Sequence, residues 1–228
     1  MPLLDLTRRQ LLGLSAFAGG LLLSAHAHAQ QPRLYDPMPP ANSAYVRVIA
    51  LSGGEYSVWA EQKERASKIA SGTPSPYMVL PPGNQQIEVR SGGQTIAVAV
   101  TTQASRSFTV LLPEMKADKA VVVSDRNNSN RLKATLMAYN LGTQPADVST
   151  ADGQTSIFKG LAPGAGMGLV VNPVTLDFKA TGADGSAAGT GRIDIAPGAA
   201  YTVVLTGASA GGAKAAVFAN AVERYQGN

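Results

Sequence analysis

Residues 200–207, near the end of the chain, repeat the pattern of residues 105–112. In both stretches an aromatic residue precedes a run of β-branched and aliphatic residues, which is the pattern of a buried strand. Each stretch closes a block of roughly 70 residues in which short apolar runs alternate with Gly and Pro turns, as in tandem β-sandwiches. The repeat therefore predicts an all-β protein with two small Ig-like sandwiches in tandem.

The two blocks also share their internal order. The first opens with an apolar strand at 44–50 and turns at 81–83, and the second opens at 132–140 and turns at 163–164. The charged residues 61–65 are expected to form a solvated loop. The predicted segments are a signal peptide (1–29), an extended arm (30–43), an N-terminal sandwich (44–113), a C-terminal sandwich (118–207), and a linker and tail (208–228).

Residues 1–29 have the pattern of an export signal. Arg8 and Arg9 precede an apolar run, and residues 27–29 have the small-x-small pattern that signal peptidase cleaves. The surroundings of the two arginines are close to the twin-arginine pattern, and a Sec signal that carries two arginines is the alternative. Both routes predict a periplasmic protein. The apolar run is interrupted by glycines and is shorter than the ~20 residues of a membrane span.

Cleavage of that signal changes the chemistry available to the chain. Both histidines, His26 and His28, lie within it, and the whole chain has no cysteine. Of 19 basic and 15 acidic residues, Arg8, Arg9 and Asp5 are removed, so that 17 and 14 remain. The basic residues are scattered, which argues against nucleic-acid binding. Without disulfides, the two sandwiches must be held by their cores.

One motif suggests catalysis. Residues 207–211 match the G-x-S-x-G nucleophile elbow, with Ser209 at its centre. A serine nucleophile needs a base, and after cleavage only Lys214 is close in the sequence, in a region with the composition of a small-residue linker. We therefore expect no enzyme activity and no catalytic residue.

Two further patterns resemble ligand sites. Residues 164–168 have the glycines of a phosphate loop, but the apolar run after them predicts a strand, where a dinucleotide site needs a helix. Asp147 with Asp152, and Asp177 with Asp184, lack the dense spacing of a calcium loop. We therefore expect no metal and no cofactor.

Two segments outside the repeats are predicted to bind partners. The arm is rich in proline, so it loses little conformational entropy on docking. In the tail, apolar residues recur at helical spacing, and so short a helix needs a surface on which to bury them. That surface is either the chain's own second sandwich or another protein. The predicted partner-binding residues are Leu34, Tyr35, Asp36, Pro37, Val217, Phe218, Val222 and Tyr225.

The order of short motifs along the chain resembles the AlgF family of periplasmic alginate O-acetylation proteins. These motifs are an L-Y-D-P arm (34–37), an x-V-R-V strand (45–48), a P-P-G turn (81–83) and an N-P-V segment (172–174). The similarity covers essentially the whole mature chain. It implies a non-catalytic adaptor that bridges membrane-bound and periplasmic acetyltransferase proteins during O-acetylation of an exopolysaccharide, either alginate or, as in related gene clusters, cellulose.

A carbohydrate-binding module is the alternative function. The chain would then hold the polysaccharide itself through exposed aromatic residues such as Tyr35, Tyr56, Trp59 and Tyr77. A sugar platform needs a coplanar, exposed aromatic row, whereas an adaptor needs an apolar patch with a polar rim. Trp59, the single tryptophan, is expected to fill a sandwich core. The exposure of these aromatic residues therefore distinguishes the two functions.

Overall fold

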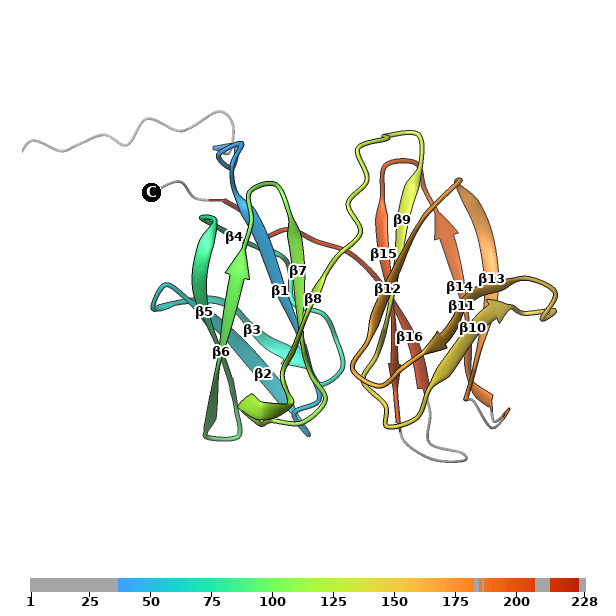
Figure 1. The fold of residues 1–228 in the computed structure, drawn as a ribbon, viewed down its shortest axis with the longest axis horizontal. Coiled ribbons are helices and arrows are strands. Elements are labelled where there is room, and N and C mark those ends of the chain that lie inside the picture. Colours follow the sequence, from blue (N-terminus) through green and yellow to red (C-terminus); the bar gives the residue numbers. More distant parts are fainter. Residues whose placement is uncertain (1–36, 183–184, 186, 208–213, 226–228) are drawn as a thin grey trace, which may run out of the picture. The chain divides into compact units, whose positions relative to one another are not determined.

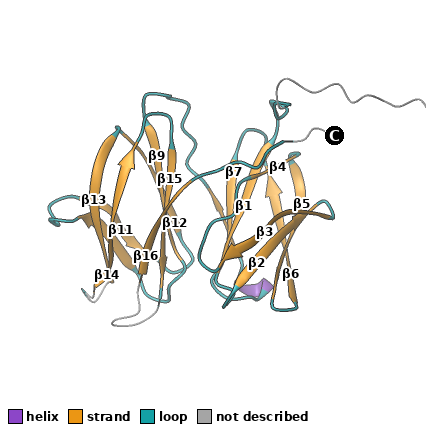
Figure 2. Ribbon diagram, turned by 180° about the vertical axis from the view of Figure 1, so that it is seen from behind, coloured by secondary structure: helices purple, strands orange, loops and turns teal. Residues whose placement is uncertain are grey.

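Residues 105–112 and 200–207 contain equivalent strands of two eight-stranded sandwiches (Figure 1). The computed structural model describes residues 37–225 except 183–184, 186 and 208–213, and the side chains of 187–188 are also left out. In this described part, the regular elements are strands and one short 3-10 helix, η1 (Ala117–Lys119) (Figure 2). The prediction of an all-β protein with two tandem sandwiches is confirmed.

The first sandwich consists of two four-stranded sheets, with the strand orders β4-β1-β7-β8 and β3-β2-β5-β6. Its strands are β1 (Ala44–Ala50), β2 (Glu55–Ala60), β3 (Lys63–Ala70), β4 (Met78–Leu80), β5 (Gly83–Ser91), β6 (Gln94–Thr102), β7 (Ser107–Leu112) and β8 (Val121–Ser124).

The second sandwich has the sheet orders β12-β9-β15-β16 and β11-β10-β13-β14, which repeat the first two orders with every strand number raised by eight. In each copy the opening strand lies parallel to the seventh, β1 beside β7 and β9 beside β15. Its strands are β9 (Ala134–Asn140), β10 (Ala146–Thr150), β11 (Ser156–Leu161), β12 (Gly166–Val171), β13 (Val174–Gly182), β14 (Ala187–Ile195), β15 (Ala200–Thr206) and β16 (Lys214–Ala219).

The opening strands β1 and β9 are buried on both faces because each face meets a different core. Val46 and Val48 of β1 point into the first core, and Leu136 of β9 points into the second. The opposite faces meet in a third apolar cluster, which we call the shared cluster and which consists of Ile49, Leu111, Met137, Tyr139, Leu141 and Val204. Residues from both sandwiches make up this cluster, so the continuous apolar runs of the sequence reflect a sheet covered on two sides.

A buried arginine also joins the two sandwiches. Arg47 of β1 is 1% exposed. Asp125, the residue directly after β8, belongs to the same cluster. Its carboxylate accepts hydrogen bonds from Thr109, Tyr139 and Tyr77. The Arg47 guanidinium donates hydrogen bonds to Thr109 Oγ1 (3.0 Å), Asn220 Oδ1 (2.8 Å), Thr202 Oγ1 (2.8 Å) and the Tyr139 hydroxyl (3.2 Å). We call these seven residues the Arg47 network.

The charges in the Arg47 network follow from its burial. Burial alone lowers the pKa of Arg47, but Tyr139, Tyr77 and Asp125 outweigh it, and the pKa lies above its ordinary value. Burial raises the pKa of the Tyr77 and Tyr139 hydroxyls against the opposing attraction of Arg47. The guanidinium therefore stays charged and both phenols stay neutral at physiological pH.

The charged residues 61–65 form a hairpin, so the loop prediction was wrong. Glu61 and Gln62 have positive φ values of 52° and 62°, as both central residues do in a type I′ turn. β3 follows at once and pairs antiparallel with β2. The sequence conceals this turn because neither central residue is the Gly or Asn that normally marks it.

The tail is a strand, so the helical interpretation of residues 217–225 was wrong. β16 pairs antiparallel with β15 along its whole length. Val217 packs against the second core and Phe218 against the shared cluster, because successive residues of a strand point to opposite faces. β8 is the equivalent eighth strand of the first sandwich and pairs with β7, although the predicted boundary at 118 assigns it to the second.

Trp59 lies outside the buried cores, so the prediction that it fills a core was wrong. It is half-buried on β2, and the guanidinium of Arg90 covers its ring at 3.9 Å from the ring centre. The indole nitrogen donates to Ser57 Oγ at 3.3 Å. The core positions of β2 are taken instead by Tyr56 and Val58, which alternate with Trp59 along the strand.

The glycines at 164–168 permit close packing of two strands. A Cβ at Gly166 would lie 2.7 Å from the Tyr139 ring and 2.9 Å from the Val123 side chain, and one at Gly168 would lie 2.5 Å from Arg126 Cβ. Real Cβ atoms essentially never approach other atoms so closely. β12 therefore packs closely against β8 and the residues that follow β8, because β12 has glycine on the face that meets them.

We predict that Gly166→Ala destabilises the protein by about 1–3 kcal/mol, because the added methyl overpacks the interface between β8 and β12. Urea unfolding followed by circular dichroism measures the effect. Gly54→Ala is the matched control, since a Cβ there meets nothing within 4 Å and the φ is not positive; it should change the stability by less than about 0.5 kcal/mol. Equal stability of both variants would contradict this packing.

We also predict a loss of stability in alkali. Burial raises the pKa of Tyr56, Tyr77 and Tyr139 in the folded chain, while an unfolded tyrosine titrates near about 10. The neutral phenols therefore stabilise the fold fully below about pH 10, and this contribution is lost as the pH rises further.

Absorbance at 295 nm during an alkaline titration, with circular dichroism in parallel, tests this prediction. Three of the seven tyrosines should ionise only together with unfolding, and Tyr139→Phe should remove one of the three. Ionisation of all seven before the strand signal changes would contradict it.

Candidate functional site

The chain after β16 crosses from the second sandwich to the first. The Tyr77 N–H donates to the Ala221 carbonyl (2.8 Å) and the Glu223 N–H donates to the Tyr77 carbonyl (2.9 Å). Tyr77 and Val222 form a parallel β-bridge, next to the edge strand β4. We call residues 220–225 the C-terminal strap, because they extend the edge of the first sandwich with the last described residues of the chain.

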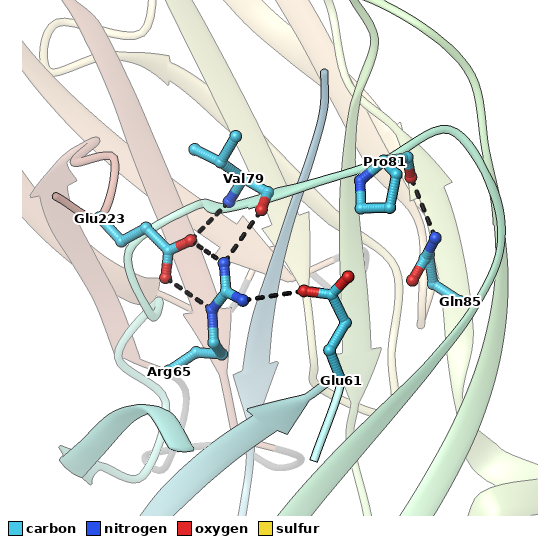
Figure 3. Close-up of polar contacts among 6 residues, drawn as sticks. All are labelled: Glu61, Arg65, Val79, Pro81, Gln85 and Glu223. Atoms are coloured by element: carbon cyan, nitrogen blue, oxygen red, sulfur yellow. Dashed lines mark hydrogen bonds and ion pairs between the residues drawn. The ribbon is translucent and has the colours of Figure 1, made fainter. Parts of the chain in front are cut away.

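Glu223 anchors this strap to the first sandwich (Figure 3). Its carboxylate accepts two hydrogen bonds from Arg65, one from Nε at 3.0 Å and a shorter one from Nη2. It also accepts the backbone N–H of Val79 at 2.7 Å. Arg65 donates further to the Val79 carbonyl (2.9 Å) and to Glu61 (3.1 Å). Arg65, Val79 and Glu61 lie on β3, on β4 and in the hairpin turn before β3, respectively.

The Arg65–Glu223 pair is a sheltered ion pair with two-pronged geometry. The two side chains are 14% and 13% exposed. The hydrogen bond to Glu223 raises the pKa of Arg65 against the opposing effect of burial. Because a two-pronged pair fixes distance and direction together, it sets the position of the strap against β3 and β4.

A groove with a volume of about 480 Å³ lies beside this pair. The arm contributes one side of it and the strap contributes another, so both ends of the described chain meet there. Its charges are balanced, since three acidic and three basic side chains line it. The lining residues are Pro40, Asn42, Ser43, Glu61, Lys63, Glu64, Arg65, Val79, Leu80, Pro81, Pro82, Glu223, Arg224 and Tyr225.

One residue of the predicted partner-binding set lines the groove, and two others lie in the chain segments that border it. Tyr225 lines it and is half-buried. Val222 lies in the same strap and is 54% exposed. Pro37, at the start of the described arm, is half-buried, and the arm reaches the groove through Pro40.

The other predicted residues lie elsewhere. Leu34, Tyr35 and Asp36 fall outside the described residues. Val217 and Phe218 are half-buried in β16 and face the cores. Of the two alternatives for the tail, this is the one in which its apolar residues are buried on the chain itself. Their packing makes them part of the fold, so any contact with a partner depends on the exposed strap after them.

Arg65 and Glu223 were not predicted as site residues. The indication in the sequence was weak: Arg65 lies in a charged segment that resembles a solvated loop, and Glu223 is the one carboxylate after Lys214. Only the folded chain brings together two residues that are 158 positions apart.

The aromatic row required by the carbohydrate-binding alternative is not formed by the described residues. Tyr56 and Tyr77 are 2% and 7% exposed, their hydroxyls donate to Val48 and Asp125, and Arg90 covers Trp59. Tyr35, the fourth candidate, lies outside the described residues.

Catalytic and metal-binding groups can be examined only where the chain is described. In that part, no three side chains of His, Cys, Asp or Glu gather as a metal site would require. Lys214 is exposed on β16, while Ser209 falls outside the described residues. Among the same residues, no helix is sufficiently long and apolar to span a membrane.

The fold and the groove define a tandem β-sandwich protein in which both ends of the described chain line one groove on the first sandwich. The profile of the family described as "Alginate O-acetyl transferase AlgF" matches residues 18–204. The chain therefore belongs to the AlgF family.

Several relatives carry the name "Alginate biosynthesis protein AlgF". The protein from Pseudomonas fluorescens is 25% identical over 88% of this chain and 90% of its own length. That from Azotobacter vinelandii is 28% identical over 86% of both chains, and that from Pseudomonas aeruginosa is 28% identical over 73% and 70%. A solved structure of the C-terminal domain of AlgF from P. aeruginosa aligns with 39% of this chain and 99% of its own, at 23% identity and a TM-score of 0.34.

We predict that Glu223→Gln releases the strap. The variant keeps the size of the side chain but removes the charge of the two-pronged pair with Arg65. The protein should therefore lose about 1–3 kcal/mol of stability, and its C-terminal end should become sensitive to carboxypeptidase. Urea unfolding and timed digestion measure the two effects.

Asp177→Asn is the matched control for this prediction. Asp177 is paired with Arg192 at 3.5 Å, but both side chains are more than half exposed, and exposed pairs contribute little. A digestion rate for Glu223→Gln that equals that of the control would contradict the anchoring role.

Proposed function

We propose that this protein is a non-catalytic adaptor in the O-acetylation of an exopolysaccharide. In this role it binds membrane-bound and periplasmic acetyltransferase proteins and brings them together. One observation carries the proposal: residues of the arm and of the tail, the two segments predicted to bind partners, line a single groove on the first sandwich. A partner could contact both segments at once there.

The comparisons support the process in which the adaptor acts. The family description names alginate O-acetyl transfer, and the relatives are named for alginate biosynthesis. These names favour alginate over cellulose as the polymer. The predicted export signal at 1–29 supports action in the periplasm, where the acetyltransferase partners are expected.

The composition of the chain supports a non-catalytic role. Once the predicted signal is removed, the chain has neither histidine nor cysteine, so a serine nucleophile would lack its usual base. The word "transferase" in the family description would then refer to the process in which the family takes part rather than to an activity of this chain. Turnover of an acetyl ester by the purified protein, lost on Ser209→Ala, would overturn this part of the proposal.

Site-specific photo-crosslinking tests the adaptor function. With p-benzoylphenylalanine at Asn42 or Tyr225, both of which line the groove, we expect crosslinks in the periplasm to proteins of the acetylation machinery. Lys159 is the control position, since it is exposed on β11 in the second sandwich and does not line the groove. Equal crosslinking at all three positions would contradict the proposed site.

A second measurement concerns the polymer. We predict that Tyr225→Ala lowers the acetyl content of the secreted exopolysaccharide by at least half, because Tyr225 is the one aromatic side chain that lines the groove and aromatic anchors carry a large share of interface binding energy. Colorimetric ester assay of the polymer measures this, and circular dichroism must show an unchanged fold. An unchanged acetyl content in a well-folded variant would contradict the role of the groove.

A further inference from the structure

A second cavity lies between the two sandwiches, away from the groove. It has a volume of about 670 Å³ and is lined by the first sandwich (Tyr45, Ser107), by the segment 125–131 that follows β8, and by the start of β15 (Ala200, Tyr201). A smaller hollow of about 340 Å³ adjoins it and shares Asp125, Arg126, Asn127 and Met137. We call the two together the inter-sandwich cleft. It shares no lining residue with the groove.

The inter-sandwich cleft is cationic. Arg126 and Arg131 line its larger part and Arg106 its smaller part, and all three are exposed. Within the described chain, none of these guanidinium groups has a hydrogen bond or an ion pair. Asp125 is the one acidic residue among the lining residues, and its carboxylate already accepts hydrogen bonds from the Arg47 network and faces the buried cation. The net field in the cleft therefore attracts anions.

Several polar groups that line the cleft are engaged in hydrogen bonds within the chain. The Asn127 amide donates to the Ser105 carbonyl (2.8 Å), and the Asn128 amide donates to the Asn130 carbonyl (3.1 Å). The Tyr201 hydroxyl donates to the Asp194 carbonyl (2.8 Å). Arg47 lies over the Tyr77 ring at 4.4 Å from its centre, so that ring offers no free stacking face on the side of the guanidinium.

Two features of the cleft discriminate between ligands. The unpaired arginines can bind carboxylates, and the side chains of Ala199, Ala219 and Val222 offer apolar surface beside them. An acidic peptide has carboxylates interspersed with small apolar side chains and so matches both features, whereas a polyuronate has carboxylates but offers hydroxyls rather than apolar groups to the two alanines and Val222.

We propose that the inter-sandwich cleft binds an acidic, extended segment of a partner protein through Arg126 and Arg131. This is a second docking site, independent of the groove where the arm and strap meet. Because the cleft is formed by both sandwiches and by the segment that joins them, a segment bound there contacts both halves of the chain.

Because this binding is electrostatic, its affinity should depend on the salt concentration. The arginines are exposed, so each contact with a carboxylate is weakened by salt. Binding should therefore weaken by at least tenfold between low and physiological ionic strength, and it should depend on the acidic character of the segment more than on its sequence.

Fluorescence anisotropy of the purified protein tests the proposal. The probe is a fluorescein-labelled peptide in which Glu alternates with Ala, and its counterpart has Gln in place of every Glu. We expect the Glu peptide to bind and the Gln peptide to bind at least tenfold more weakly. The double variant Arg126→Gln/Arg131→Gln should weaken binding of the Glu peptide at least tenfold.

Arg192→Gln is the matched control, because Arg192 is also exposed but lies on β14, outside the cleft. Thermal melts of all variants verify folding, and Arg126→Lys/Arg131→Lys, which keeps the charge, should retain most of the affinity. Equal binding of both peptides, or equal affinity in the double variant and the control, would overturn the proposal.

An oligouronate is the third ligand in the same assay. Binding of the oligouronate at Arg126 and Arg131 without binding of the Glu peptide would overturn the peptide assignment and make the cleft a polysaccharide site. These measurements use the isolated protein, so their outcome is independent of the crosslinks expected from the groove, and either proposal can fail alone.

Discussion

The burial of a single guanidinium constrains the whole arrangement of the chain. Arg47 is 1% exposed, and a charge removed from water costs several kcal/mol unless it is fully hydrogen-bonded and compensated. Besides Tyr77, which lies directly before β4, its partners come from four places: β7 of the first sandwich, the segment after β8, the strands β9 and β15, and the segment after β16. The charge is therefore compensated only when all four are in place, so the network selects one arrangement of the two sandwiches.

Both candidate sites depend on that arrangement. Asn220 accepts a hydrogen bond from Arg47, and only three residues later Glu223 reaches Arg65, so the network fixes the origin of the strap that borders the groove. At the other end, Asp125 belongs to the network and Arg126 follows it directly, so the same contacts fix the wall of the inter-sandwich cleft. A buried polar network of this kind contributes specificity more clearly than stability.

The repeat in the sequence was sufficient to predict the fold, and the reason is local: β7 and β15 are buried runs whose pattern depends little on distant contacts. The predictions failed where long-range contacts decide the structure. The apolar residues of the tail fit a period of 3.6 residues as well as a period of 2. Only the pairing of β16 with β15 determines that this segment is a strand. The hairpin at Glu61 and Gln62 lacks the usual glycine. Arg65 and Glu223 could not be paired from one sequence, since nothing local connects them.

The two copies of the fold also explain why the network exists once. Arg47 lies beside Thr109 in the parallel pair β1–β7, and Met137 lies beside Thr202 in the equivalent pair β9–β15. Asp125 and Asn220 each directly follow the eighth strand of their copy. At these equivalent positions one copy has the cation and the carboxylate, while the other has a thioether and an amide. A second arginine in place of Met137, beside Thr202, would bury a further positive charge close to Arg47 and its single carboxylate, which is costly. The asymmetry between the copies is therefore what allows the two sandwiches to share a polar centre.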